Sequence, residues 1–491
     1  MQPDATSAKP AGAAPDPAAQ SSLSGSSIRL LPWLIAVAFF MESLDTTILN
    51  TAVPTIASAL HVAPLSMKSV LASYTLSLAV FIPISGWMAD RFGTRRVFAS
   101  AIGIFTLGSF LCGISSNIHL LVACRLLQGC GGSMMVPVGR LTIVRTFSKS
   151  DLVRAMSFVS IPALIGPMLG PIAGGLIVGY LHWRVIFFVN IPIGLIGLFM
   201  VYQHLPDYRE EHRNPLDMGG LILFGSGIGL LSYVLEVFGE HTLSGVEMLA
   251  GLVIAVLLLA GYGWHATTAR FPMLRLSLFR IRTFRSAVNG NFLTRLGIGG
   301  IPFLFPLLYQ IGLGLTPIQS GLLMMPQAIA AMSLKMTMPW ILAKVGYRGV
   351  LISNTLVIGL LIFVFSTIGR STPIWLIVAE VFCYGFFTSL QYTSMNTLVF
   401  ADVTDEKASS ASSIASTVQQ LSITFGIATE SLLTVFFLPA RFQSNPLEFI
   451  GGVHKAFYVL GGMTLLSTIV FFELRKGDGD AVSEGKTLHA V

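Results

Sequence analysis

Apolar stretches long enough to cross a membrane recur along most of this chain, and only short polar segments separate them. Of the 491 residues, 53% are hydrophobic and 11% are Asp, Glu, Lys or Arg, whereas about 25% of the residues in an ordinary soluble domain are charged. A water-soluble protein of this size could not cover its surface with so few charged side chains. The sequence therefore predicts an all-α integral membrane protein, because uninterrupted apolar runs, rather than alternation in segments of about ten residues, argue against a membrane barrel.

Fourteen spans of about 20 residues fit the pattern. The first six are expected at residues 31–53, 67–89, 97–115, 119–139, 155–179 and 184–203. The other eight are expected at 218–237, 247–265, 286–311, 318–343, 350–369, 373–399, 411–438 and 454–473. Residues 1–28, mostly Pro, Ala and Ser, are expected to be a disordered tail. The first span lacks a signal-peptide cleavage site.

The distribution of Lys and Arg predicts the orientation. With the N-terminus in the cytoplasm, 22 of the 30 basic residues lie on the cytoplasmic side, 5 on the opposite side and 3 inside spans. Cytoplasmic loops carry such an excess, so both termini are expected in the cytoplasm. The net charge of +7 then reflects topology rather than nucleic-acid binding. The four cysteines lie in predicted spans without metal-ligand spacing, so neither a metal nor a cofactor is expected.

Two parts of the chain repeat each other. Residues 64–97 align with residues 317–350 at an offset of 253, and a later offset of 256 pairs Gly129 with Gly385 and Gly170 with Gly426. Spans 1 to 6 and 9 to 14 are therefore expected to be two copies of one six-helix bundle, with spans 7 and 8 inserted. The expected divisions are a tail at 1–28, a bundle at 29–204, a linker with two helices at 205–270, a second bundle at 271–474 and a cytoplasmic tail at 475–491.

Several motifs follow one another in an order typical of one transporter family. Residues 44–54 read LDTTILNTAVP, residues 86–96 read GWMADRFGTRR, and residues 125–129 read RLLQG. The fifth span carries three pairs of small residues or prolines, and residues 187–194 read FFVNIPIG. This sequence resembles the fourteen-span drug:proton antiporters of the major facilitator superfamily, and within them the multidrug exporters of bacterial inner membranes. The resemblance implies the major facilitator fold.

Two carboxylates in the first span are candidates for proton coupling. Asp45 lies near mid-membrane, where a charge costs about 2.5 to 3.5 kcal/mol, so it is expected to face a cavity or a partner. Glu42 shares its helix face, and two like charges in a poorly solvated place cannot both ionise easily. Arg125 of the fourth span is the expected partner. The alternative is that these charges only hold helices together as permanent ion pairs.

The resemblance implies two further functional segments. A cytoplasmic gate, whose ion pairs break during switching, would comprise Gly86, Asp90, Arg91, Gly93, Arg95 and Arg96. Gly86 is expected to allow close helix approach and Gly93 a tight turn. The fifth-span antiporter motif, which would close the cavity against proton leak, comprises Gly166, Pro167, Gly170, Pro171, Gly174 and Gly175. Basic loop residues around a turn and ordinary tight packing are the alternative interpretations.

Other polar residues inside the spans are candidates for lining the cavity: Asn50, Gln128, Arg295, Glu380, Gln391, Gln420 and Glu430. The sequence thus predicts a proton-coupled antiporter of the bacterial inner membrane that exports lipophilic small molecules by alternating access. Its expected partners are these molecules, protons and membrane lipid, with no nucleic acid and a monomeric chain. The alternatives are a facilitator-type transporter for one metabolite, and a polytopic membrane enzyme or transport-inactive sensor. The sequence has no His cluster or Ser/His/Asp set that would favour an enzyme.

Overall fold

The computed structural model describes residues 25–147, 159, 165–166, 169–209, 215–237, 244–437 and 445–479. In this part of the chain, eleven helices are long and apolar enough to cross a membrane. Residues 1–24 of the predicted tail lie outside the described residues, and the first described helix begins at Gly25, so that the last four residues of the expected tail, 25–28, are helical.

The helices fall into three groups along the chain. The first group is α2 (Gly25–Ala59), α3 (Lys68–Phe92), α4 (Thr94–Ile114), α5 (Ile118–Thr146), α7 (Val185–Phe188) and α8 (Asn190–His204). Leu169–Tyr180 is a shorter apolar helix at the position of the fifth span. The second group is α9 (Met218–Val237) and α10 (Gly245–Thr268). The third group is α11 (Arg282–Ile298), α12 (Ile301–Leu307), α13 (Pro317–Phe365), α14 (Ile374–Leu398), α15 (Asp405–Phe437) and α16 (Pro446–Ser467).

Side-chain caps fix the start of several helices. The Asn117 side chain accepts a hydrogen bond from a backbone N–H in the first turn of α5. Ser244 with Glu247, and Thr316 with Gln319, form reciprocal capping boxes at α10 and α13. Each cap satisfies backbone N–H groups that have no partner inside the helix. These helices therefore begin at defined residues.

The ninth span is broken, although its sequence predicts one helix over 286–311. Helix α11 ends at Ile298, α12 covers Ile301–Leu307, and a π-helical turn follows over Leu308–Gly312. A Cβ atom at Gly300 would lie 2.4 Å from the Cβ of Glu430, so α15 crosses the break at a distance that only glycine allows.

Residues that are aligned by the sequence repeat have the same structural role. Gly93 and Gly346, one offset apart, both adopt a positive φ (93° and 72°) at the turn between two spans. The second of these turns is so tight that α13 runs through it as one bent element. Glycine has no Cβ to obstruct this conformation.

The repeat also extends to contacts between helices. A Cβ at Gly129 would lie 2.8 Å from the carbonyl oxygen of Tyr74, and a Cβ at Gly385 would lie 2.5 Å from the carbonyl oxygen of Gln327. Gly385 follows Gly129 by 256 residues, and Gln327 follows Tyr74 by 253. The same close helix contact therefore occurs twice, at the offsets of the sequence repeat.

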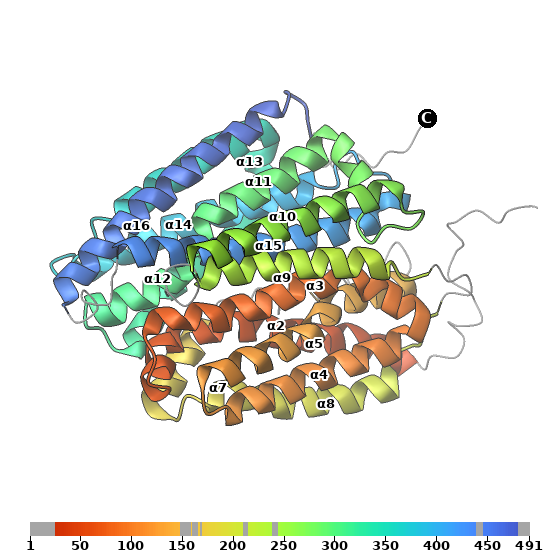
Figure 1. Cartoon of the computed structure of the whole chain (residues 1–491), viewed down its shortest axis with the longest axis horizontal. Helices are drawn as coiled ribbons and strands as arrows, with labels where there is room; N and C mark the ends of the chain where they lie inside the picture. The colour runs from red at the N-terminus through yellow and green to blue at the C-terminus, as the bar shows by residue number, and fades with distance from the viewer. Residues whose placement is uncertain are drawn as a thin grey trace, which may run out of the picture.

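Figure 1 shows the first and third groups side by side, with α9 and α10 lying across the face between them. Helix α9 contacts α3 of the first group and α15 of the third group, as well as α10. We call the end that holds loops 60–63, 308–316 and 366–373 the distal end. The opposite end, at which α2 begins, is the terminal end.

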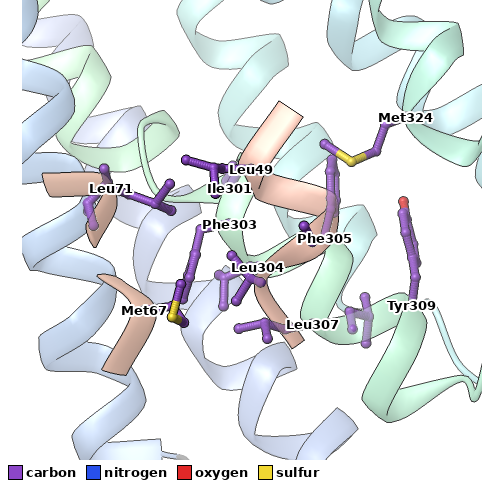
Figure 2. Packing of buried hydrophobic residues seen from close by; sticks show 14 of the residues in the cluster. Leu49, Met67, Leu71, Ile301, Phe303, Leu304, Phe305, Leu307, Tyr309 and Met324 are labelled. Atoms are coloured by element: carbon purple, nitrogen blue, oxygen red, sulfur yellow. The ribbon is translucent and has the colours of Figure 1, made fainter. Parts of the chain in front are cut away.

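The two large groups share an apolar core at the distal end. One buried cluster there contains Leu49 and Met67 from the first group, and Ile301 and Phe303 from the third (Figure 2). Towards the terminal end the buried apolar side chains separate into two clusters. One lies within the first group, and the other belongs to the second and third groups with Ala79 of α3 added. The described part of the chain is therefore closed by apolar packing mainly at its distal end.

Two glycines let the groups approach at the distal end. A Cβ at Gly175 would lie 2.6 Å from the carbonyl oxygen of Pro317, and a Cβ at Gly321 would lie 2.3 Å from the carbonyl oxygen of Pro171. Contacts this short leave no room for any side chain. The distal closure therefore depends on glycine at these positions.

We expect Gly321→Val to hold the distal end apart. In purified protein whose four cysteines are replaced by alanine, a cysteine at the buried position Thr51 should then react several-fold faster with a bulky maleimide. Gly451→Val is the matched control, because a Cβ at Gly451 meets no heavy atom within 4 Å. Equal labelling rates in the two variants would contradict this account of the closure.

Candidate functional site

Asp45 of α2 and Arg125 of α5 form a buried ion pair. Arg125 Nη1 donates to Asp45 Oδ2 at 2.6 Å, and the two side chains are 1% and 0% exposed, respectively. Removing both charges from water costs several kcal/mol per ion, which their attraction offsets only when further hydrogen bonds satisfy the remaining polar atoms. The structure thus brings together the two residues that the sequence predicted to be partners.

Three further side chains complete what we call the Asp45 network: Gln128, Asn190 and Ser109. Asp45 Oδ1 accepts hydrogen bonds from Gln128 Nε2 at 2.9 Å and from Asn190 Nδ2 at 3.0 Å. Gln128 also accepts from Arg125 Nη1 at 2.7 Å, and both amides lie within hydrogen-bond distance of Ser109 Oγ. Helices α2, α4, α5 and α8 therefore meet at one carboxylate.

Tyr74 of α3 lies against the arginine of this network. The Arg125 Cζ atom is 4.3 Å from the centroid of the Tyr74 ring, a distance typical of a cation–π interaction. The buried Tyr74 hydroxyl has no hydrogen-bond partner among the described residues. The guanidinium group is thus held by a ring as well as by the carboxylate and an amide oxygen.

Sequence reasoning missed three of these side chains. Asn190 had a usable signal, because it is the one amide in the apolar stretch FFVNIPIG. Ser109 and Tyr74 had none, because a hydroxyl inside an apolar span can bond to its own helix. Only the three-dimensional arrangement places them beside Asp45.

Glu42 lies one turn before Asp45 on α2 but outside the Asp45 network. Its side chain is half-buried and forms no hydrogen bond or ion pair with the described residues. Arg140 of α5 is a cation close enough for its charge to act on Glu42. The two carboxylates therefore differ: Asp45 is fully enclosed and paired, whereas Glu42 is partly accessible.

The predicted gate lies at the terminal end and contacts segments that the sequence did not indicate. Asp90 accepts a hydrogen bond from Arg145 Nη2 of α5 at 2.9 Å. The Arg95 N–H donates to Asp207 Oδ1 at 3.2 Å, and Arg95 Nε donates to the carbonyl oxygen of Leu205. The linker after α8 is therefore attached to the turn between α3 and α4.

The remaining gate residues give a mixed result. Gly93 forms the predicted tight turn. The expectation of close helix approach at Gly86 is wrong for this structure, because Gly86 is exposed and a Cβ there would meet nothing within 4 Å. Arg91 lies 5.9 Å from the Trp87 ring centroid. Arg96 is exposed and has no ion-pair partner in the described part of the chain.

The fifth-span motif packs tightly against α2, as predicted. A Cβ at Gly166, Gly170 or Gly174 would lie 2.7, 2.1 or 2.3 Å, respectively, from an atom in residues 43–48 of α2. The contacted residues of α2 lie on both sides of Asp45 along the chain. Pro171 is buried in the helix Leu169–Tyr180, and Pro167 lies outside the described residues.

Two amides predicted to line the cavity, Gln128 and Gln391, are instead buried and hydrogen-bonded to neighbouring helices. Gln128 belongs to the Asp45 network. Gln391 donates to Thr355 Oγ1 at 2.8 Å and accepts from Asn354 Nδ2 at 2.8 Å, which fixes it between α13 and α14. In both cases a nearby polar side chain from a neighbouring helix satisfies the amide, so it does not face open space.

The other candidates differ in burial and in their polar contacts. Arg295 is buried, donates to Asn291 and lies 3.6 Å from the ring centroid of Tyr392, with no carboxylate partner among the described residues. Glu380 and Glu430 are buried, and one carboxyl oxygen of Glu380 and both of Glu430 have no hydrogen-bond partner there. Both Asn50 and Gln420 are half-buried.

Comparison with known proteins decides the family. The sequence profile of the Major Facilitator Superfamily matches residues 35–427. This chain belongs to that superfamily. It is a multi-pass membrane protein of a transporter family rather than an enzyme, as the motifs indicated.

Its relatives include bacterial proteins of one name. The chain is 42% identical over 402 residues to a putative multidrug resistance protein MdtD of Serratia proteamaculans, covering 82% of this chain and 84% of that protein. It is 40% identical over 409 residues to the protein of the same name from Cronobacter sakazakii, covering 83% of this chain and 86% of that protein.

Solved structures share the fold. A POT family transporter in complex with a thioalcohol conjugated peptide matches with a TM-score of 0.69 at 15% identity, covering 92% of this chain and 98% of that one. A D-xylose-proton symporter matches with a TM-score of 0.65 at 14% identity, covering 94% and 100%. At such low identity, these matches establish the major facilitator fold alone.

We expect Asn190→Ala to destabilise the folded protein, because Asp45 loses a hydrogen-bond donor inside a dry site. A loss of about 1 to 3 kcal/mol is typical when a buried charged group loses a partner. Thermal unfolding in detergent measures it, with Asn50→Ala as the control, since Asn50 is a half-buried amide outside the network. If both variants unfold at the same temperature, the network does not contribute to stability.

Proposed function

We propose that this protein is a proton-coupled antiporter that exports lipophilic small molecules from the cytoplasm by alternating access. The observation that carries the proposal is the fully enclosed Asp45, ion-paired to Arg125 and held by two amides. The relatives named multidrug resistance proteins support the substrate class.

The Asp45 network suits proton exchange because it couples a charge to the position of four helices. When a proton neutralises Asp45, the attraction that fixes Arg125 is lost and the arginine keeps an uncompensated charge in a dry site. Movement of α5 relative to α2 relieves this cost. Loss of the proton restores the pair, so protonation and helix position depend on each other.

Glu42 is the residue through which a proton or a cationic substrate would first reach this network. It is partly accessible and lies one turn from the enclosed carboxylate. A cationic lipophilic substrate near Glu42 would favour its charged form and disfavour a proton there. Competition of this kind makes substrate binding and proton binding alternatives, as exchange requires.

We further propose fourteen spans, arranged as six-helix bundles at 29–204 and 271–474 with two inserted helices between them, in a monomer of the bacterial inner membrane. Support comes from the eleven apolar helices and from the contacts that recur at offsets of 253 and 256. The excess of basic residues at the terminal end supports a cytoplasmic position for both termini. The distal end then faces outward, and the structure represents the state closed to the outside.

We assign the gate residues to the step in which the terminal end closes and the distal end opens. Closing the terminal end would bring the exposed face of α3 at Gly86 against the other bundle, and it would strain the contacts of Asp90 with Arg145 and of Arg95 with the linker. These ion pairs and hydrogen bonds stabilise the present state. The buried glycines of the fifth span keep α2 closely packed while the bundles move.

We expect Asp45→Asn to abolish proton-driven export while the protein still inserts into the membrane. Asparagine keeps the size of the side chain and one acceptor oxygen, but it carries no charge and takes up no proton. Efflux of a lipophilic cation from proteoliposomes under an imposed pH gradient measures the effect. Glu247→Gln is the control, because Glu247 is an exposed carboxylate that caps α10.

Normal proton-driven efflux by Asp45→Asn would overturn the assignment of Asp45. If the unmodified protein transports one metabolite but none of a broad panel of lipophilic compounds, the result would favour a specific metabolite transporter. Proteoliposomes that move neither class of compound would favour the transport-inactive sensor.

A further inference from the structure

Three arginines surround a cavity beside α10 that the transport site does not use. The cavity has a volume of about 620 Å³ and lies where α10 ends and the chain turns back towards α11. Arg270, Arg275 and Arg280 line it, together with the apolar side chains of Phe271 and Pro272. We call it the arginine pocket.

The charges of this pocket are not neutralised within the described residues. The guanidinium groups of Arg270, Arg275 and Arg280 form no ion pair or hydrogen bond there. The next arginines along the chain differ, because Arg282 pairs with Asp478 at 2.6 Å and Arg285 pairs with Glu473. Three convergent cations without a carboxylate among the described residues favour an anion as the ligand.

The backbone of the pocket is held in place by α9 and α10. Asp217, just before α9, accepts from the Met273 N–H at 3.0 Å and is 2.6 Å from His265 Nε2 of α10. The Leu274 N–H donates to the Tyr262 hydroxyl at 3.1 Å. The segment between Arg270 and Arg275 is thus fixed at two successive residues.

The charge on Asp217 contributes to this attachment at neutral pH. Partial burial alone would raise the pKa of Asp217, but hydrogen bonds from the Gly220 N–H, from His265 and from the Met273 N–H lower it below its usual value. The carboxylate is therefore ionised under physiological conditions, and the attachment would weaken only as the pH falls towards that lowered pKa.

The residues around the pocket are suited to contact with a membrane lipid. Only 11% of the apolar stretch of α10 is buried inside the protein, so the outer face of this helix is available to the bilayer. Trp264, one turn before the end of α10, is 75% exposed, and tryptophan is enriched at the depth of the headgroups. Thr267 and Ser277 add hydroxyl groups to the lining.

We propose that the arginine pocket binds the phosphate headgroup of an anionic phospholipid, whose acyl chains lie along the exposed face of α10. Basic pockets at the cytoplasmic ends of membrane helices recognise such headgroups, and each basic residue near the surface adds to the attraction. A lipid in this place holds the α9–α10 pair against α3 and α15. The inference is independent of the proposed transport function.

The test is a titration of phosphatidylglycerol into the purified full-length protein, with bound lipid counted by native mass spectrometry. The variant Arg270→Gln/Arg275→Gln/Arg280→Gln should bind at least about tenfold more weakly than the unmodified protein, because three charges contribute. Phosphatidylcholine should bind both proteins equally and weakly. Equal thermal stability of the two proteins shows that the variant is folded.

A matched control removes three other exposed charges, in Lys344→Gln/Arg475→Gln/Lys476→Gln. It should retain the affinity of the unmodified protein for phosphatidylglycerol. Equal losses in both triple variants would mean that binding follows net charge alone and would overturn the site. Displacement of the lipid by millimolar inorganic phosphate would also overturn the proposal, because the ligand would then be a free anion.

Discussion

The first half of the molecule is organised around one buried ion pair. Asp45 and Arg125 lie out of contact with water, where an unpaired charge would cost several kcal/mol. Four helices and the ring of Tyr74 must therefore keep their places for both groups to remain satisfied. The charge state of this site therefore bears on the relative positions of whole helices, which that of a surface ion pair would not.

The second half has the same helix packing without the ion pair. The repeat offsets place Ile298 at the position of Asp45 and Val381 at the position of Arg125. Both are buried apolar residues in the shared distal cluster. Gly426 meanwhile packs on Arg295 of α11 and on Gly299 just after it, as Gly170 packs on α2. Two copies of one scaffold have thus diverged, so that one holds a charge pair where the other holds an apolar contact.

The sequence predicted the elements whose signal is local or periodic, and it failed where a distant side chain decides the outcome. Apolar length predicted the eleven membrane-length helices of the described residues, and the repeat predicted the paired turns at Gly93 and Gly346. The break after Ile298 was not predictable, because it depends on the crossing of α15. Within the site, Asp45 and Arg125 were conspicuous as rare charges. The attachment of Arg95 to the linker could not be predicted, because the sequence of an exposed basic loop does not show whether its arginines have a partner.

The length of α10 makes the thickness of the bilayer relevant to the molecule. A helix of 24 residues is about 36 Å long, whereas the hydrocarbon core is about 30 Å thick. Such a helix tilts when the membrane is thin and stands upright when it is thick. Because α9 connects α10 to α3 and α15, that tilt acts on the seam between the two large groups. The thickness of the host bilayer is therefore felt, through α10 and α9, at the contacts that α9 makes with α3 and α15.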